Sequence, residues 1–278
     1  MNCAWMELLS VLPIWLRVDV DNLGRDTLQE IRLRAAQPVE LVLGGQRMRL
    51  SRLVTQEDLQ FVLNTASNYS PWSSQTLSEG YLTAPGGHRI GVCGEAVVKN
   101  GEMVGIRCPS SLCVRVARNI KGLATVDTAL RGSVLIIGKP GSGKTTLLRD
   151  WIRARARGGQ GSVTVVDERK ELFPSGTDWS EFGVDILSGC EKCVGMEKVL
   201  RTMGPHTIAV DEITSARDCA AMLHVAWCGV KLLATAHASC REDLMARPVY
   251  KPLVEGGIFD SLVMIQDNRS WITERMPR

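Results

Sequence analysis

The chain has 278 residues, of which 45% are hydrophobic and 23% are charged. This length exceeds that of one average domain, and the composition supplies a sizeable core and excludes a chain that is disordered throughout. The net charge of +3 is close to balance, so the composition gives no indication of a nucleic-acid-binding protein.

The N-terminal stretch, residues 1–18, is apolar but is interrupted by Glu7, Pro13 and Arg17. It lacks the basic start and the cleavage site of a signal peptide, and the chain has no uncharged apolar run of the length that spans a membrane. We expect a short helix packed on its own domain, with docking on a membrane or a partner as the alternative use. The nine cysteines are scattered, which predicts free thiols in a reducing compartment, the cytoplasm.

Residues 1–120 have the pattern of a smaller α+β domain. Thr55 is placed to cap a helix predicted over residues 57–66, where apolar residues recur at helical spacing. Turns are predicted at Gly44-Gly45 and Asn100-Gly101. The predicted strands are 30–34, 39–42, 47–50, 81–84, 89–93, 96–99 and 103–106. Their alternation of apolar and polar residues predicts an antiparallel sheet with one face in water.

From residue 121 to residue 278, strands and helices alternate, after a connection predicted over residues 119–131. The predicted strands are 133–137, 162–166, 207–210, 231–235 and 261–265, and the helical runs among them are 144–157, 193–203 and 215–228. Nearly continuous apolar strands separated by helices indicate a parallel sheet that is covered on both faces. This half is therefore predicted to be an α/β domain.

An uninterrupted phosphate-binding loop follows the first of these strands. It consists of Gly138, Lys139, Pro140, Gly141, Ser142, Gly143, Lys144 and Thr145, and Thr146 continues it into the helix. The glycines let successive backbone N–H groups turn around an anion, and the N-terminal end of the helix favours negative charge. Lys144 supplies a positive charge for the β- and γ-phosphates, and Thr145 offers a hydroxyl to Mg²⁺. Strand, loop and helix together indicate a nucleotide-binding protein.

Two of the predicted strands end in acidic residues. Asp211 and Glu212 follow one strand, where Asp211 would face the Mg²⁺ and Glu212 would orient or deprotonate the attacking water. Asp167 and Glu168 follow another and are candidate further ligands of the metal. For this second pair an ordinary charged loop over residues 167–171 is an equally open interpretation.

His237 follows a third strand, at the edge of the sheet where the phosphates are expected. A neutral imidazole at this position would hydrogen-bond the γ-phosphate or its water, and a purely structural histidine is the alternative. Cys190 and Cys193 form the only close cysteine pair in the sequence. Without a second pair, or histidines at zinc-finger spacing, they are interpreted as small apolar residues in preference to zinc or redox ligands.

These motifs, in this order, resemble those of the secretion ATPases, the traffic ATPases of type II and type IV secretion and of pilus machines. The match includes the phosphate loop, the acidic residues 167–171, Asp211-Glu212 and Thr235-Ala236-His237. Within that superfamily the chain is similar to the sporulation branch, the stage III AA family of endospore-forming bacteria. The segments that resemble this branch are 30–34, 38–41, 86–94, 106–107, 110–112, 115–118, 195–196 and 201–203.

The resemblance implies a RecA-like P-loop NTPase domain with a parallel central sheet, preceded by the smaller α+β domain. It implies ATP and Mg²⁺ as ligands and a ring of identical subunits, expected to be a hexamer. In such families arginines of the first domain reach the phosphates, and by position the candidates are Arg107, Arg115 and Arg118, with Arg201 as a further one. Surface arginines with no catalytic role are the alternative for each of them.

On this basis we expect an ATP hydrolase with Glu212, Lys144 and His237 in catalysis, located in the cytoplasm and peripheral at a membrane. It would power or assemble a membrane-embedded secretion or channel complex during sporulation. A nucleic-acid-associated ATPase is a second hypothesis, which the small net charge disfavours. A nucleotide-gated scaffold with little turnover is a third, and its hint is Thr214, which stands where the family pattern has glycine.

Overall fold

The computed structural model describes residues 4–67, 80–118, 132–159, 161–173 and 183–276. The chain splits into two compact units. Of the described residues, the first unit contains 4–67 and 80–118, and the second contains all those from 132 onward. The connection predicted over residues 119–131 lies outside the described residues. Each unit has a hydrophobic core of its own.

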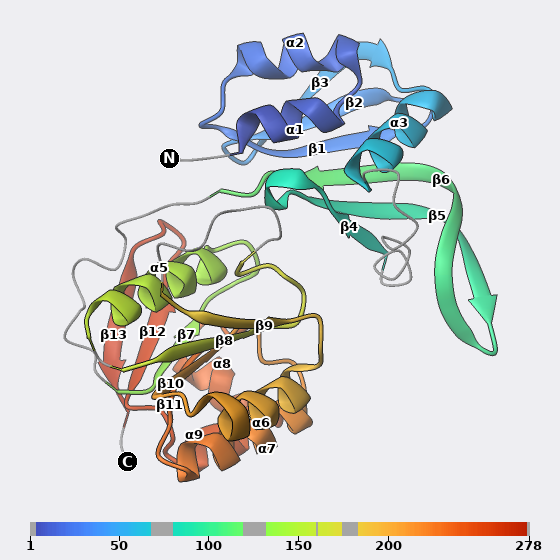
Figure 1. Cartoon of the computed structure of the whole chain (residues 1–278). Helices are drawn as coiled ribbons and strands as arrows, with labels where there is room; N and C mark the ends of the chain where they lie inside the picture. Colours follow the sequence, from blue (N-terminus) through green and yellow to red (C-terminus); the bar gives the residue numbers. More distant parts are fainter. Residues whose placement is uncertain (1–3, 68–79, 119–131, 160, 174–182, 277–278) are drawn as a thin grey trace. The chain divides into compact units, whose positions relative to one another are not determined.

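The first unit is an antiparallel sheet covered by helices (Figure 1). Its helical elements are α1 (Trp5–Val11), α2 (Ile14–Leu23), α3 (Gln56–Ala66) and the short 3₁₀ turn η2 (Pro85–Gly87). Its strands are β1 (Leu28–Arg34), β2 (Pro38–Leu43), β3 (Gln46–Leu53), β4 (Tyr81–Thr83), β5 (Arg89–Lys99) and β6 (Glu102–Arg115). Among the described residues they form one sheet in the order β3-β2-β1-β6-β5-β4, with antiparallel neighbours. This architecture is the predicted α+β one.

Local sequence signals explain where these helices begin. The Thr55 hydroxyl accepts the N–H of Asp58, whose carboxylate accepts the N–H of Thr55, so the predicted cap of α3 is confirmed. The N-terminal stretch forms two helices, however, where one was predicted. Leu12 is extended (φ −85°, ψ 151°), as residues before a proline are, and Pro13 then starts α2.

The hairpin of β5 and β6 is longer than the sequence predicts. The two strands expected over 89–93 and 96–99 are one continuous strand, and β6 continues far beyond residue 106. A bulge next to Gly94 joins the two halves of β5. A Cβ at Gly94 would lie 2.7 Å from the carbonyl oxygen of Arg107, so only glycine allows the strands to approach this closely here.

The second unit alternates strands and helices along the chain. Its strands are β7 (Val134–Ile137), β8 (Val163–Asp167), β9 (Asp185–Ser188), β10 (Thr207–Val210), β11 (Lys231–Ala236), β12 (Ser261–Ile265) and β13 (Trp271–Arg275). Its helices are α5 (Lys144–Arg157), α6 (Lys192–Met203), α7 (Ala216–Trp227), α8 (Arg241–Ala246) and α9 (Lys251–Glu255). The strands pair in the order β13-β12-β7-β11-β10-β8-β9, and within the described residues β13 alone is antiparallel to its neighbour.

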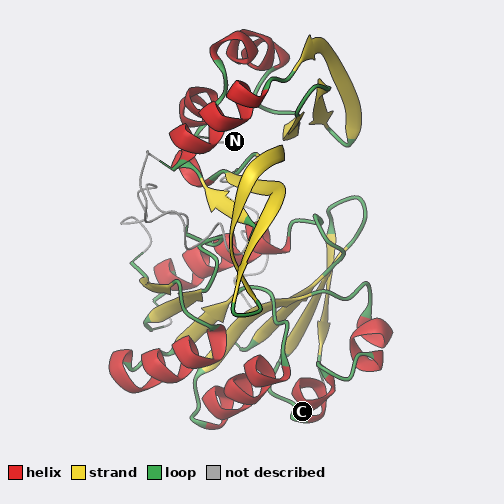
Figure 2. Cartoon of the chain, turned by 90° about the vertical axis from the view of Figure 1, so that its right-hand side faces the viewer, coloured by secondary structure: helices red, strands yellow, loops and turns green. Residues whose placement is uncertain are grey.

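Helices cover both faces of this parallel sheet (Figures 1 and 2). On one face, apolar residues of α5 such as Leu148 and Ile152 pack with Ile136 of β7. On the other face, residues of α6, α7 and α9 pack with the strand residues that point the opposite way, such as Leu135. The central strands are mostly apolar because both of their faces are buried. The predicted α/β architecture of this half is therefore confirmed.

Within the described residues, the structure contains no helix that is both long and apolar enough to cross a membrane.

Candidate functional site

The candidate site lies at the edge of the second unit's sheet where four parallel strands end. Val210 of β10 pairs with Ala234 of β11 and with Val166 of β8, and Ala236 of β11 pairs with Ile137 of β7. The strands are therefore in register, and the segments that follow them leave the sheet at the same edge. These segments contain the phosphate loop, both predicted acidic pairs and His237. The sheet thus gathers motifs that lie up to a hundred residues apart.

The phosphate loop has the backbone conformation that its glycines permit. Gly141 and Gly143 are left-handed, with φ of 74° and 105°, and Gly143 directly precedes α5. A Cβ at Gly138 would lie 2.5 Å from the Ser142 hydroxyl, which excludes any larger residue. Gly143 offers no side-chain acceptor to the first turn of α5. The N–H groups of that turn point toward the loop and favour an anion there.

The remaining loop residues are more exposed. Lys139 and Pro140 are exposed, and the Lys139 ammonium pairs with the Asp267 carboxylate at 2.8 Å. Ser142 closes the loop by donating its backbone N–H to the Lys139 carbonyl at 3.2 Å. Thr146 lies in the first turn of α5 and is partly exposed.

Lys144 is buried at the centre of the site. Its Nζ donates to the carbonyl oxygens of Gly138 and Lys139, both at 2.9 Å, and to His237 Nδ1 at 3.0 Å. Burial lowers the pKa of the Lys144 ammonium, and the carboxylates of Glu212 and Asp211 oppose that shift. The ammonium is therefore held by neutral acceptors, with negative charge nearby.

His237 connects Lys144 to Glu212. An ammonium has only donors, so the His237 Nδ1 that faces it is the acceptor, and the ring proton lies on Nε2. Nε2 is 3.0 Å from Glu212 Oε1 and donates to it. The side chains of His237 and Glu212 are 31% and 33% exposed, so water can reach both. This geometry requires a neutral His237 ring with its proton on Nε2, and the contact of that ring with the γ-phosphate stays a prediction.

Asp211 joins the phosphate loop to the end of β11. Its Oδ2 accepts from the Thr145 hydroxyl at 2.9 Å, and its Oδ1 accepts from the Thr235 hydroxyl at 2.6 Å. The N–H of Glu212 donates to the same Oδ1 at 3.0 Å and to the Thr235 oxygen at 2.8 Å. The structure thus brings Thr145, Asp211 and Glu212 together, with Thr235 between the last two.

Asp167 has different hydrogen-bond partners from Asp211. It is 2% exposed, and its two oxygens accept the backbone N–H groups of Glu171 (2.9 Å) and Phe173 (2.7 Å). Burial raises the pKa of the Asp167 carboxyl to about 6, and the hydrogen bond from the Phe173 N–H opposes that shift. Arg149 of α5 donates to the carbonyl oxygens of Glu171 and Leu172 from the other side. Asp167 and Arg149 therefore fix the shape of the acidic loop.

Glu168 forms an ion pair with Lys192, the first residue of α6. Lys192 is 5% exposed, an unusual position for a lysine. The two residues line a small pocket together with Asp167, Arg169, Glu171, Asp211 and Glu212. Carboxylates outnumber cations in this pocket, so the buried ammonium offsets part of their mutual repulsion. The sequence gives no signal for Lys192, because its partner is 24 positions away along the chain.

Three of the four candidate arginines lie in the first unit. Arg107 pairs with Glu95 across the hairpin at 2.9 Å, and both side chains are exposed. Arg118 donates to the backbone carbonyl oxygens of Asp26 and Leu28, which fixes the start of β1. Arg115 ends β6 and is exposed. Arg201, in the last turn of α6 in the second unit, is exposed as well.

Thr214 and Cys193 have structural roles in the fold. Thr214 donates both its N–H and its hydroxyl to Asp218, and so takes part in the cap of α7. Cys193, near the start of α6, is buried in the hydrophobic core. Within the described ranges, no three or more His, Cys, Asp or Glu side chains gather as a ligand set for a metal.

Comparison with known proteins identifies relatives over nearly the whole chain. The family described as "Sporulation stage III, protein AA" matches residues 7–272. Stage III sporulation protein AA of Bacillus subtilis (strain 168) is 38% identical over 271 residues, which cover 91% of this chain and 88% of that protein.

Solved structures of a pilus retraction motor and of an ATPase share the fold. The pilus retraction motor PilT with bound ADP aligns with a TM-score of 0.64 and 15% identity, over 95% of this chain and 83% of that one. The ATPase DotB of Yersinia pseudotuberculosis aligns with a TM-score of 0.62 and 15% identity, over 94% of this chain and 77% of that one. At these identities the likeness establishes the fold alone: it is the RecA-like P-loop fold that the sequence predicts.

Proposed function

This chain belongs to the sporulation stage III protein AA family, and we propose that it is a Mg²⁺-dependent ATPase. ATP binding and hydrolysis would power or assemble a membrane-associated secretion or channel complex during sporulation. One observation supports this most directly: Lys144, Thr145, Asp211, Glu212 and His237 meet at the phosphate loop in a single hydrogen-bonded set. The set contains a cation for phosphate, two oxygen ligands for a metal and a carboxylate base beside a histidine.

The phosphate loop supports triphosphate binding in this proposal. The N–H groups of the first turn of α5 and the left-handed glycines provide donors for phosphate oxygens. Lys144 would donate to the β- and γ-phosphates, which would compete with its present acceptors, the Gly138 and Lys139 carbonyls and His237 Nδ1. Charged phosphate oxygens are stronger acceptors than neutral ones, so the competition favours the nucleotide.

The donor set at Thr145 and Asp211 fits Mg²⁺. A hydroxyl and a carboxylate are the hard oxygen ligands that this ion prefers, and they lie 2.9 Å apart. Bound there, Mg²⁺ would supply positive charge to the phosphate oxygens. Asp167 and Glu168 remain proposed only as more distant contributors, because the former accepts two backbone N–H groups and the latter pairs with Lys192.

Glu212 is the proposed base. Its carboxylate is partly exposed to water, and His237 Nε2 donates to one of its oxygens. The second oxygen is available to accept a proton from a water molecule that attacks the γ-phosphate. His237 contacts both Lys144 and Glu212. Its hydrogen bonds would therefore change when a phosphate draws Lys144 away.

The proposal extends to the assembly. We propose a ring of identical subunits, expected to be a hexamer, on the cytoplasmic face of a membrane, acting on membrane-embedded partner proteins. In that ring the arginines of the first unit would add positive charge at the phosphates. Of the three candidates, Arg115 is favoured, because Arg107 pairs with Glu95 and Arg118 holds the backbone of β1.

Binding of a fluorescent ATP analogue to Lys144→Ala tests the nucleotide site. We expect affinity to fall at least about 10-fold, because a hydrogen bond from a charged group is lost. Lys198→Ala, an exposed lysine of α6, is the control with the same loss of charge and should bind as the parent does. Equal affinity of a folded Lys144→Ala variant and the parent would refute the proposed site.

A further inference from the structure

The backbone at Glu212 has a conformation that non-glycine residues rarely adopt. Its φ is +39°, in the left-handed region, where a side chain crowds its own backbone. Such strain persists only where surrounding contacts enforce it, and it is concentrated at functional sites. The contacts that enforce it here are therefore of interest for the position of the Glu212 carboxylate.

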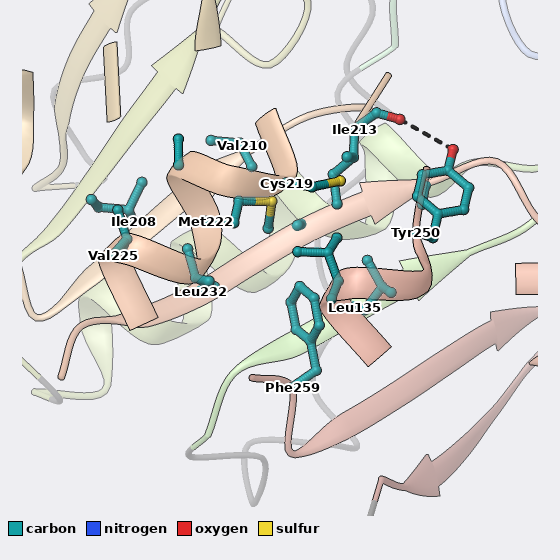
Figure 3. Packing of buried hydrophobic residues seen from close by; sticks show 14 of the residues in the cluster. Leu135, Ile208, Val210, Ile213, Cys219, Met222, Val225, Leu232, Tyr250 and Phe259 are labelled. Carbon is teal, nitrogen blue, oxygen red and sulfur yellow. Dashed lines mark hydrogen bonds between the residues drawn. The ribbon is translucent and has the colours of Figure 1, made fainter. Parts of the chain in front are cut away.

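The next residue, Ile213, is held at both of its backbone groups. Its N–H donates to the Thr235 carbonyl at 2.8 Å. Its carbonyl accepts from the hydroxyl of Tyr250 at 3.1 Å, in a buried position (Figure 3). Together with the hydrogen bonds of the Glu212 N–H to Asp211 and Thr235, these contacts leave the segment little freedom to relax.

Tyr250 belongs to a different part of the chain, at the start of α9. It is 5% exposed. Burial raises the pKa of its hydroxyl, so the hydroxyl keeps its proton and remains a donor at neutral pH. The phenol oxygen therefore anchors the backbone directly after Glu212. The Glu212 carboxylate in turn pairs with His237 at 3.0 Å.

A hydrogen bond from α7 holds the segment that contains Tyr250. The thiol of Cys219 in α7 donates to the carbonyl of Val249 at 3.0 Å. Burial raises the pKa of that thiol to about 11, so it keeps its proton and remains a donor at neutral pH. The ring of Tyr250 is part of the hydrophobic cluster of α7 and α9 (Figure 3). The hydroxyl is thus presented to the site by a packed and hydrogen-bonded segment.

We propose that Tyr250 is a positioning residue for the hydrolysis proposed above. Its hydroxyl clamps the segment after β10 to the start of α9, and so holds the Glu212 carboxylate against His237. The inference rests on the proposed function, in which Glu212 is the base. It adds a residue that touches neither nucleotide nor metal, and that acts by fixing the backbone after Glu212.

Tyr250→Phe removes only the hydroxyl and is the direct test. We expect kcat for Mg-ATP to fall by about 10- to 100-fold, the range typical when a group that supports a reactive side chain is lost. KM for ATP should stay unchanged, because the phosphate loop is untouched. Tyr81→Phe, the same change at a buried tyrosine of the first unit, is the matched control and should keep the parent's kcat.

Amide hydrogen exchange gives a second readout that does not depend on turnover. In Tyr250→Phe, the amides of residues 211–214 should exchange faster than in the parent, whereas in Tyr81→Phe they should not. Unchanged exchange in this segment overturns the clamp, and so does unchanged kcat in Tyr250→Phe with an active parent. A parent without turnover refutes the proposed function instead, and the exchange data then decide the clamp alone.

Discussion

The two oxygens of Asp211 have different partners. Oδ2 accepts from the Thr145 hydroxyl and faces the phosphate loop, whereas Oδ1 accepts from Thr235 and from the N–H of Glu212. One carboxylate therefore orients the proposed metal-binding hydroxyl and the backbone of the proposed base together. Thr235 completes this arrangement, because its hydroxyl donates to Asp211 and accepts from Glu212.

Thr235→Val is expected to lower both stability and turnover. Valine has nearly the shape of threonine but leaves Asp211 without one of its donors, which should cost about 1–3 kcal/mol of unfolding free energy. Urea unfolding and steady-state phosphate release measure the two effects. Thr164→Val is the control: Thr164 is buried in β8, and its hydroxyl has no hydrogen-bond partner among the described residues. Equal behaviour of the two variants would contradict this role of Thr235.

The sequence predicts those residues of the site that belong to local motifs. Asp211, Glu212 and His237 follow predicted strands, and Lys144 and Thr145 end the phosphate loop that follows another, so the sheet places them. The supporting residues could not be found in this way. Thr235 gives a weak signal as a polar residue in a buried strand, but Lys192 and Tyr250 meet their partners only through the tertiary fold.

At the scale of elements, the central strands of the second unit's sheet were predictable and its edge strands were not. β7 and β10 are buried at every position, and their sequences are almost entirely apolar. β9 and β13 lie at the two edges of this sheet and are mostly exposed or half-buried, so no apolar run marks them. These two strands are recognised by their pairing partners, which sequence periodicity does not reveal.

The short helix α8 depends on an ion pair and a cap that acid removes. The Asp243 carboxylate accepts from Arg247 at 2.9 Å and from the Ser239 N–H at 2.7 Å. The Arg247 hydrogen bond, followed by those of Ser239, lowers the pKa of Asp243 to about 2. A carboxyl whose pKa is lower in the folded than in the unfolded chain stabilises the fold above its unfolded pKa, and this stabilisation is lost as the pH falls through the folded value.

Asp243→Asn should therefore destabilise the protein at pH 7, and its difference from the parent should shrink as the pH falls from about 4 toward 2. The unfolding free energies of the parent and the variant, measured in urea at pH values from 7 down to 3, test this. A difference that stays constant over this range would show that the charge of Asp243 does not matter for α8.

At the scale of the whole molecule, the two units contribute different parts to the proposed ATPase. The second unit contains the whole hydrogen-bonded set at the phosphate loop, from Lys144 to Glu212. The first unit contributes an antiparallel sheet and the exposed Arg115. A motor needs a site that cleaves the γ-phosphate from ATP and a second body that responds to this cleavage. The division into two units supports the proposed motor role.

The most direct test is phosphate release from Mg-ATP by the parent and by Glu212→Gln, with nucleotide binding measured alongside. Glutamine keeps the acceptor for His237 but cannot take a proton. We predict that the parent turns over ATP, and that Glu212→Gln binds ATP as tightly but is slower by about 100-fold or more, the contribution of a general base. A parent that releases no phosphate, or a Glu212→Gln variant as active as the parent, would contradict this account.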